Sequence, residues 1–315
     1  MTEAPTAAIP SMPQQLDVFE SLRSRISPET TIRRQEPLSR RTTLRVGGPA
    51  DIYLEPASIE NLSAIVRFCH DKDVPYFVLG RGSNLLIKDA GFRGVVISLA
   101  TPHFSRIEIG GEHLCCGAGA KLKAVAFEAR RHGLSGLEFL EGIPGTVGGG
   151  LRMNAGAMNG EIFNAVESVR VMDSTGCVQE RTPSDLQVSY RSCSALKYNI
   201  ALGAVLRGSP APMEQIEQRM KEFSQKRWSS QPAAPSAGCI FKNPITIPAG
   251  KLIDELGLKG TRVGGAYVSS EHGNFIINDG TGTARDVLDL IDLIRQCARK
   301  QRGIELETEV EILGD

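Results

Sequence analysis

The sequence predicts an α+β fold that is divided into two or three domains. Its 315 residues exceed the length of one typical domain. Short apolar runs typical of strands alternate with helical patterns over the first two thirds of the chain. At residues 209–212 a Ser-Pro-Ala-Pro stretch precedes a long polar helical pattern, which indicates a domain boundary. We therefore expect a variable N-terminal lead over residues 1–36, a large domain over 37–209 and a C-terminal domain over 210–315.

The large domain is expected to begin with β-α-β units. Ser58 is of the residue type that caps a helix, and the apolar residues after it share one helical face, namely Leu62, Ile65, Val66 and Cys69. The helix is expected to end at Val74-Pro75, because proline cannot continue it. Strand-like runs flank this helix at residues 51–54, 76–79 and 95–99.

A second set of elements follows in the same domain. Residues 106–109 and 114–116 are expected to form a hairpin across Gly110-Gly111. Apolar spacing over residues 121–131 predicts a helix, which Gly133 closes. Further strands are expected at residues 166–172, 177–180 and 201–207.

The C-terminal domain is expected to contain three helices and a final strand. Thr283 and Asp286 form a capping box at the start of the helix over 283–300, and Gly303 ends that helix. Its apolar stripe consists of Val287, Leu288, Ile291, Ile294 and Cys297. The other expected elements are helices at 213–228 and 249–256 and a strand at 310–313.

Composition excludes several classes of protein. Lys plus Arg and Asp plus Glu number 36 each, so the chain lacks the positive charge of a broad nucleic-acid-binding surface. No apolar run reaches the length of a membrane span, and residues 1–15 lack the pattern of a secretory signal. We therefore expect no membrane insertion and no nucleic-acid partner.

The cysteines favour a reducing compartment. There are seven, an odd number, and none forms a CxxC pair. The only metal-like cluster, His113 with Cys115 and Cys116, alternates as a strand does, so we expect no metal site. These observations favour a cytoplasmic protein with reduced thiols.

The first candidate binding loop follows the strand expected at residues 76–79. Two glycines, a serine and an asparagine occur in sequence there, and successive N–H groups in such a turn can bind an anion. We interpret the loop as a diphosphate site, although it matches neither the P-loop nor the GxGxxG pattern and a simple tight turn is the alternative. Its residues are Gly80, Arg81, Gly82, Ser83 and Asn84.

A second glycine-rich segment spans residues 142–150 and continues to the Asn-Ala-Gly-Ala of 154–157. Each glycine loses extra backbone entropy on folding, so five of them within nine residues suggest that a ligand lies against the backbone. The alternative is a mobile loop. The interleaved Ile143, Pro144 and Val147 favour packing over mobility.

These glycine segments, together with Arg45-Val-Gly-Gly-Pro-Ala50, resemble the FAD-binding fold of vanillyl-alcohol-type oxidases, also called the PCMH type. Five further motifs resemble the UDP-N-acetylenolpyruvoylglucosamine reductase family. The resemblance extends from about residue 40 to the C-terminus. The motifs are SYR at 189–191, SAGCIFKNP at 236–244, AGKLID at 249–254, HGNFIIN at 272–278 and LETEV at 306–310.

The resemblance implies two α+β subdomains that bind FAD over residues 37–209 and a C-terminal α+β domain that binds substrate, with the last strand returning to the active site. None of the five histidines lies in the glycine segments, so we expect non-covalent FAD. The expected FAD-binding residues are Arg45 and Gly47 on the adenine side, Gly80, Arg81, Gly82, Ser83 and Asn84 at the diphosphate, and Gly142, Pro144, Gly145, Thr146, Gly149, Asn154 and Gly156 around the flavin.

The implied reaction is the NADPH-dependent reduction of the enolpyruvyl ether of UDP-N-acetylenolpyruvoylglucosamine to UDP-N-acetylmuramate in bacterial peptidoglycan precursor synthesis. The hydride would reach the substrate through FAD N5. A Rossmann fingerprint is absent, so NADPH and the UDP-sugar would use one pocket in turn. The expected state is a cytoplasmic monomer. The alternatives are another FAD-linked oxidase or dehydrogenase of this fold, or a non-catalytic flavin or nucleotide sensor.

Three residues are the catalytic candidates. Arg191 would stabilise negative charge beside the substrate carboxylate, because a guanidinium pairs with a carboxylate through two bonds. Glu309 would act with it, although Glu305, Glu307, Glu309 and Glu311 share one parity and a solvated strand face is the alternative. Cys239 stands where the family commonly has serine, and it would donate the proton. The alternative is a small buried apolar residue.

The substrate candidates carry weaker signals. Tyr190 would stack on nicotinamide or substrate, or else it packs against the protein. Lys242 and Asn243 would lie near the substrate diphosphate. Lys226 and Arg227 are further candidates there, unless they form an ordinary exposed helix end.

Overall fold

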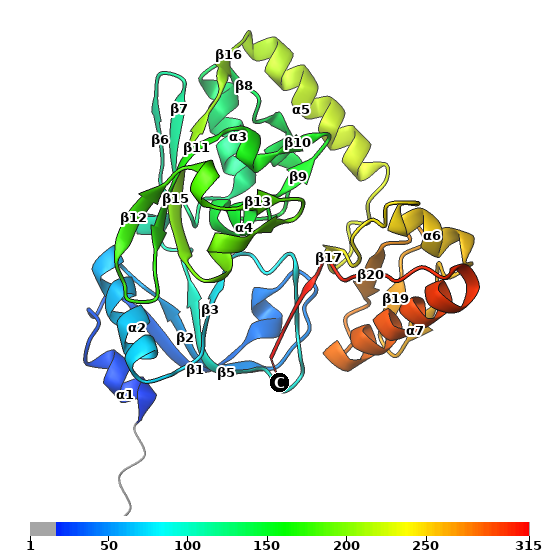
Figure 1. Ribbon diagram of the computed structural model, residues 1–315, viewed down its shortest axis with the longest axis horizontal. Coiled ribbons are helices and arrows are strands. Elements are labelled where there is room, and N and C mark those ends of the chain that lie inside the picture. The colour runs from blue at the N-terminus through cyan, green and yellow to red at the C-terminus, as the bar shows by residue number, and fades with distance from the viewer. Residues whose placement is uncertain (1–16, 315) are drawn as a thin grey trace, which may run out of the picture.

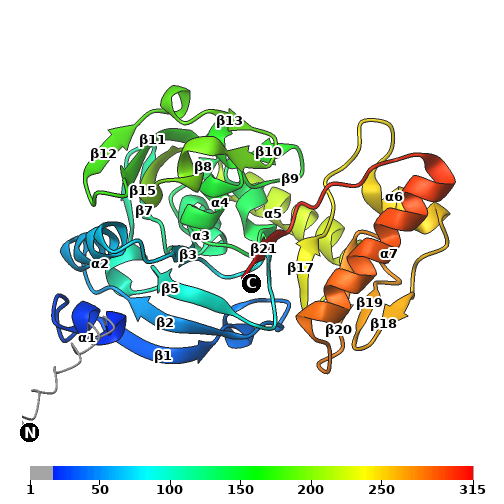
Figure 2. The ribbon, with the colours of Figure 1, turned by 60° about the horizontal axis from the view of Figure 1, so that its bottom comes forward.

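The computed structural model describes residues 17–314 and contains three units (Figures 1 and 2). The predicted disordered lead over 1–15 lies outside the described residues. Residues 17–36, which were expected to form a variable lead outside the large domain, belong instead to the first unit. Helix α1 (Val18–Arg23) buries Leu22 completely, and strand β1 (Thr31–Pro37) joins the first sheet.

The first unit is built on a four-stranded sheet. β1 runs antiparallel to β2, whereas β2 and β3 both run parallel to the central β5. Helix α2 (Ile59–Asp71) packs its predicted apolar face on this sheet, and Ser58 caps the helix as expected. The strand order is β1, β2 (Pro49–Glu55), β5 (Phe92–Ser98) and β3 (Tyr76–Leu79).

The second unit is a five-stranded antiparallel sheet with helices on one face (Figure 1). The hairpin across Gly110-Gly111 and the helix α3 (Leu122–Arg131), closed by Gly133, are confirmed. His113 pairs with Glu167 at 3.0 Å, and no group of metal-ligating side chains occurs among the described residues. The strand order is β12 (Val178–Arg181), β11 (Val166–Met172), β15 (Ile200–Arg207), β7 (His113–Gly117) and β6 (Ile107–Gly110).

The second glycine segment, interpreted above as a loop, contains the short helix α4 (Val147–Arg152). The Thr146 hydroxyl oxygen accepts from Gly149 N at 3.4 Å and so caps this helix. Val147 and Leu151 are fully buried in the core of the second unit. Two buried apolar side chains and a cap therefore hold a helix whose glycines disfavour it.

Helix α5 (Met213–Trp228) was expected to belong to the C-terminal domain. Its buried residues, Ile216 and Met220, instead pack in the core of the second unit. By packing, the C-terminal unit therefore begins after Trp228 and not at residue 210. The Ser-Pro of the predicted boundary forms β16 (Ser209–Pro210), which pairs with β8 (Leu134–Ser135).

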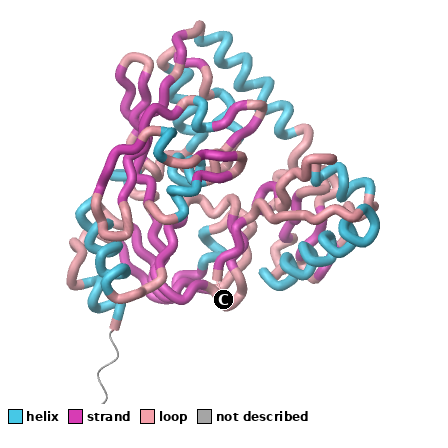
Figure 3. The backbone as a smooth tube through the Cα atoms, viewed as in Figure 1, coloured by secondary structure: helices cyan, strands magenta, loops and turns pink. Residues whose placement is uncertain are grey.

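The third unit carries two helices beside a four-stranded antiparallel sheet (Figure 3). The predicted stripe of α7 (Ala284–Arg302) supplies Val287, Ile291 and Ile294 to its core. Leu44, Val46 and Leu86 reach this core from the first unit. The remaining elements are α6 (Ala249–Glu255) and the strands β17 (Ser236–Cys239), β20 (Phe275–Asn278), β19 (Ala266–Val268) and β18 (Arg262–Val263).

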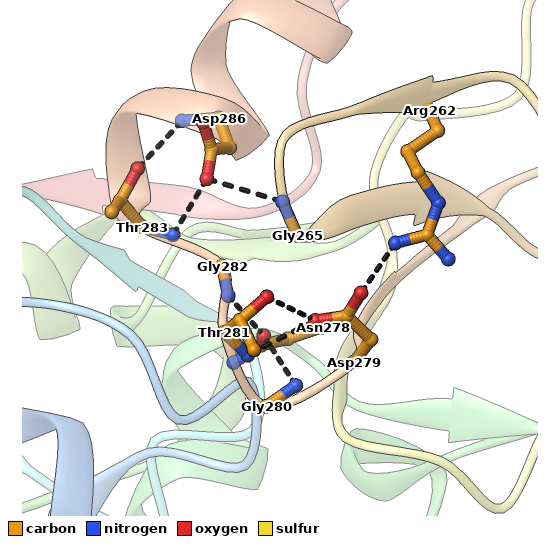
Figure 4. A network of polar contacts seen from close by, with 9 residues as sticks. All are labelled: Arg262, Gly265, Asn278, Asp279, Gly280, Thr281, Gly282, Thr283 and Asp286. Atoms are coloured by element: carbon orange, nitrogen blue, oxygen red, sulfur yellow. Dashed lines mark hydrogen bonds and ion pairs between the residues drawn. The ribbon is translucent and has the colours of Figure 1, made fainter.

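A dense polar network orders the turn between β20 and α7 (Figure 4). The buried Asn278 accepts from Gly280 N and Gly282 N through Oδ1 and donates to the Leu44 carbonyl at 3.0 Å. The predicted capping box is present, because Thr283 and Asp286 each accept the other's backbone N–H. Asp89 of the first unit adds a second cap, since its carboxylate accepts from the first two amides of α7 at 2.9 Å.

The last strand returns to the first unit, as Figure 2 shows. β21 (Glu311–Leu313) pairs in parallel with β4 (Leu85–Ile87), which directly follows the first glycine loop. The chain thus enters the C-terminal unit from the second unit, after α5, and leaves it into the first unit through β21. Among residues 17–314, no helix has the length and apolar character needed to cross a membrane. Two short hairpins complete the strands, β9 (Gly156–Ala157) with β10 (Gly160–Glu161) and β13 (Val188–Ser189) with β14 (Ser192–Cys193).

Candidate functional site

Both glycine segments line one cavity of about 380 Å³ that faces the C-terminal unit. All five residues of the first loop, 80–84, contribute to its wall. From the second segment come Pro144, Gly145, Thr146, Gly149 and Gly156. The same wall contains Arg191, Cys239 and Glu309, so the structure brings the three catalytic candidates to one place.

A second cavity of about 650 Å³ adjoins the first and extends between the first and second sheets. The two cavities share the wall formed by Gly80, Arg81, Thr146, Gly149 and Arg152. Beyond this wall the lining is mainly apolar and includes Leu99, Ala118, Ile200 and Ala201. The pair of cavities therefore forms one elongated site, with a polar end at Arg191 and an apolar end between the sheets.

Two glycines of this wall differ in the room that they leave for a side chain. A Cβ on Gly80 would lie 2.8 Å from Thr146 Oγ1, so the two glycine segments are in contact there. At Gly149, which lines both cavities, a Cβ would meet nothing closer than 3.6 Å. The protein's own packing therefore requires the glycine at position 80 but leaves room for a side chain at position 149.

The Arg191–Glu309 pair forms the polar end. Arg191 Nε lies 3.1 Å from Glu309 Oε1, with 22% and 15% of the two side chains exposed. The buried Nε–H is not aligned for a hydrogen bond, so charge holds the pair. Burial raises the pKa of Glu309, while Arg191 and Lys242 oppose that rise.

Backbone geometry explains where Arg191 points. Its φ is +54°, in the left-handed region, within the turn between β13 and β14. A Cβ on Gly156 would lie only 3.0 Å from Arg191 Nη1, so the guanidinium rests against that glycine. Asn154, expected to border the flavin, does not line either cavity. Its amide donates to the Ser189 carbonyl at 3.2 Å and so holds the segment that carries Arg191.

Cys239 ends β17, next to the backbone of Glu309. Glu309 N donates to the carbonyl of Ile240, the residue after Cys239, at 2.8 Å. Burial and the negative charge of Glu309 raise the pKa of the Cys239 thiol to about 12, although Arg191 and Arg227 oppose the rise. The thiol is therefore protonated throughout the physiological pH range and able to donate a proton.

Several predicted site residues lie elsewhere. Arg45 and Gly47 line neither cavity. A Cβ on Gly47 would lie only 2.6 Å from the Ile87 carbonyl oxygen. The Arg45 carbonyl accepts a hydrogen bond from the side-chain amide of Asn278 in the C-terminal unit. Their expected place on the adenine side gains no support from the structure. Gly142 lines only a third cavity, described below.

The three substrate candidates are also outside the walls of the two main cavities. Tyr190 is half exposed and its ring contacts the Arg191 guanidinium, 5.1 Å from the ring centre. Lys242 pairs with Glu307 at 3.0 Å. Asn243 accepts from Ala249 N at 3.0 Å and so supports the start of α6. The structure gives Asn243 a local role, because its side-chain oxygen is already occupied.

A third cavity of about 350 Å³ shares wall residues with the first and carries four cationic side chains and one anionic side chain. It is lined by Gly142, Pro144 and Gly145, by the exposed Trp228, by Glu141 and by the cations Arg81, Lys121, Lys123 and Arg227. Glu141 pairs only with Lys123 among these cations, at 3.0 Å. Arg227 also lines the first cavity, and it forms no ion pair with any residue of the described chain.

Arg152 was missed at the sequence level. It lines both main cavities, donates to the Leu196 carbonyl at 2.9 Å and pairs with Glu311 at 2.5 Å. In the sequence it is a lone arginine after a run of glycines, and only its position within the second glycine segment could have indicated it.

Family models match most of the chain. A model described as UDP-N-acetylenolpyruvoylglucosamine reductase, C-terminal domain, matches residues 231–313, and an FAD binding domain model matches residues 50–181. The first match begins just after α5, in agreement with the packing of that helix.

Relatives that match this chain over nearly its whole length share one description. The UDP-N-acetylenolpyruvoylglucosamine reductase of Clostridium novyi is 39% identical over 306 residues, which cover 96% of this chain and 99% of that protein. A reductase of the same description from Symbiobacterium thermophilum is 43% identical over 298 residues, covering 94% and 96%. The crystal structure of the Thermus caldophilus reductase superposes with a TM-score of 0.79 at 39% identity, over 91% of this chain and 99% of that one.

Proposed function

Because the chain belongs to the UDP-N-acetylenolpyruvoylglucosamine reductase family, we propose that it reduces the enolpyruvyl ether of UDP-N-acetylenolpyruvoylglucosamine to UDP-N-acetylmuramate with NADPH as hydride donor. The protein is an FAD oxidoreductase of peptidoglycan synthesis, and its fold is the predicted PCMH-type FAD-binding fold joined to a C-terminal α+β domain. One observation carries the proposal: Arg191, Cys239 and Glu309 meet in a cavity walled by both glycine segments.

The residues present fit FAD. The two adjoining cavities provide an apolar end, a narrow wall of bare backbone at Gly80 and Gly149, and a polar end. We place the diphosphate against residues 80–84 and Arg152, because peptide N–H groups and a guanidinium bind phosphate. FAD bound there would supply the hydride-transfer chemistry.

The chain's own residues would act on the substrate. Arg191 would bind the substrate carboxylate and stabilise the negative charge that develops beside it. Glu309 keeps the guanidinium oriented through the 3.1 Å ion pair. The Cys239 thiol would hold the proton that is delivered to the substrate carbon, and its raised pKa keeps that proton in place beforehand.

The cationic third cavity is our candidate for the phosphates of both nucleotides. Arg227 lines this cavity and the first one, so it would contact a diphosphate that reaches the site from either ligand. Occupation by NADPH and then by the UDP-sugar would give ping-pong kinetics.

We further propose a cytoplasmic monomer, and the seven free cysteines support a reducing compartment.

Gly149→Ala is expected to weaken FAD binding by about tenfold or more without lowering stability. The added methyl has room within the protein but occupies the shared wall of the cofactor site. Within a helix, alanine is favoured over glycine by about 1 kcal/mol, so the apoprotein should not melt earlier. FAD titration by fluorescence and thermal melting of the apoprotein measure the two effects.

Gly148→Ala provides the contrasting neighbour. A Cβ at position 148 would lie 3.1 Å from the Ala118 Cβ, so this variant should lower the melting temperature of the apoprotein. Equal FAD affinity in Gly149→Ala and wild type would contradict the placement of the cofactor along α4.

The proposed reaction is tested by anaerobic mixing of the FAD-loaded protein. NADPH should bleach the yellow colour, and the enolpyruvyl UDP-sugar should restore it with formation of UDP-N-acetylmuramate. Colour that returns only on admission of oxygen would identify an oxidase instead. Colour that never bleaches with NADPH or NADH would favour a non-catalytic flavin protein.

A further inference from the structure

The backbone of Glu309 lies where the C-terminal unit meets the first unit. Its N–H donates to the Ile240 carbonyl of the C-terminal unit at 2.8 Å. Its carbonyl accepts from the side-chain amide of Asn84, the last residue of the first glycine loop, at 3.1 Å. The peptide before Glu309 is thus bound by the C-terminal unit, and the peptide after it is bound by the first unit.

The neighbouring residues show that the chain crosses between units at this point. Before Glu309, Thr308 bridges to Phe241, and Glu307 accepts from Lys242 N at 2.9 Å, so the chain follows the C-terminal unit. After Glu309, Glu311 N donates to the Asn84 carbonyl at 3.0 Å and β21 pairs with β4 of the first unit. Asn84 therefore contacts the crossing with both its side chain and its backbone.

A second clamp secures the crossing. Arg152 of α4 pairs with Glu311 through both carboxylate oxygens, at 2.5 Å and 3.4 Å. Its remaining nitrogen donates to the Leu196 carbonyl, so the guanidinium is fixed from the second unit. With Glu311 held in this way, the Asn84 amide is the side-chain donor that fixes the carbonyl of Glu309 itself.

We propose that Asn84 is a positioning residue for Glu309, and that its amide couples the loop expected to hold the FAD diphosphate to the carboxylate that orients Arg191. The inference rests on the proposed function of Arg191 and Glu309. Loss of the amide would free the Glu309 carbonyl, while the N–H bond to Ile240 and the β21–β4 pairing remain. The carboxylate would then lose its fixed orientation, and the Arg191 pair would loosen.

The test compares Asn84→Ala and Asn84→Asp with wild type in the two half-reactions. In both variants, reoxidation by the enolpyruvyl UDP-sugar should slow by about tenfold more than reduction of bound FAD by NADPH does. Aspartate has nearly the shape of asparagine but no amide donor, so it should not rescue. Asn164→Ala, at an exposed position outside the cavity walls, is the matched control and should leave both rates unchanged.

A second readout is independent of turnover. In the FAD-free protein, hydrogen–deuterium exchange of a peptide covering residues 305–314 should be faster in Asn84→Ala than in wild type or Asn164→Ala. Unchanged exchange and unchanged reoxidation would overturn the proposal. Equal slowing of both half-reactions would also overturn it, because Asn84 would then act only through the cofactor loop. If the wild type itself is not reoxidised by the UDP-sugar, the proposed reaction fails, and the exchange result still decides the role of Asn84.

Discussion

Replacing Arg191 with alanine is expected to slow reoxidation by the UDP-sugar by about 10²–10³-fold, the usual effect of removing one donor that stabilises developing charge. The guanidinium lies at the polar end of the site, held by Glu309 and by contact with Gly156. Reduction by NADPH should change far less, because no carboxylate beside a double bond takes part in it. Anaerobic stopped-flow spectroscopy of the two half-reactions measures this difference.

Two further variants sharpen the prediction. Arg191→Lys keeps the charge but loses the planar fork, so we expect an intermediate loss of about tenfold. Arg170→Ala removes an exposed arginine on the outer strand pair, 3.9 Å from Glu180, and should leave both rates unchanged. If Arg191→Ala slowed both half-reactions equally, a general structural role would explain the loss better than charge stabilisation.

Removal of Arg191 should also change the pH dependence. Burial raises the pKa of Glu309, and Arg191 is the larger of the two charges that oppose the rise. Without the guanidinium the pKa of Glu309 should move higher still, so the carboxyl would stay protonated to higher pH. Protonation of the Glu309 carboxyl, followed by its infrared C=O band, is therefore expected at higher pH in Arg191→Ala than in wild type.

The sequence predicted the elements whose pattern is local. The stripe and capping box of α7 and the face of α2 are confirmed, because helix periodicity and caps are written within a few residues. Helix α4 was missed because its glycines disfavour a helix and only Val147 and Leu151 bury it. The packing of α5 was misjudged for a similar reason, since just Ile216 and Met220 are buried among polar residues.

The glutamates near the C-terminus show what a strand pattern cannot reveal. Glu305, Glu307, Glu309 and Glu311 share one parity, which is typical of a solvated face. The structure divides them, because the chain crosses between units in their midst: the side chains of Glu305 and Glu307 are 65% and 76% exposed, whereas those of Glu309 and Glu311 are 15% and 34% exposed. The contact that fixes Glu309 joins residues 225 positions apart, and no local pattern encodes such a contact.

Cys239→Ala is the second variant with a large expected effect, a loss of at least about 10²-fold in reoxidation by the UDP-sugar. Alanine fills much of the same space but has no proton to donate. Cys239→Ser should retain measurable turnover, because a hydroxyl occupies nearly the same position. Cys177→Ala, at an exposed cysteine on the second unit, is the matched control and should behave as wild type. Near-wild-type reoxidation in Cys239→Ala would refute the donor role.

The environment of Cys239 reduces the advantage of a thiol over a hydroxyl. A free thiol has a pKa near 8.5, which suggests a much stronger acid than serine. Burial and the charge of Glu309 raise the pKa of Cys239 to about 12, so the thiol in this site is a far weaker acid than its reference value implies. We therefore expect Cys239→Ser to lose less activity than the reference pKa values alone would suggest.

The raised pKa also predicts the behaviour of Cys239 in alkaline solution. An acid catalyst loses activity as pH rises through its pKa, so reoxidation should not decline between about pH 7 and about pH 9 on account of this thiol. Because the thiolate is the nucleophile toward iodoacetamide, Cys239 should remain unmodified while the exposed Cys115 and Cys177 react in the same sample. Peptide mass mapping provides this internal comparison. Labelling of Cys239 as fast as that of Cys177 would mean that the thiol ionises near its ordinary pKa, and the site would then hold no protonated donor at alkaline pH.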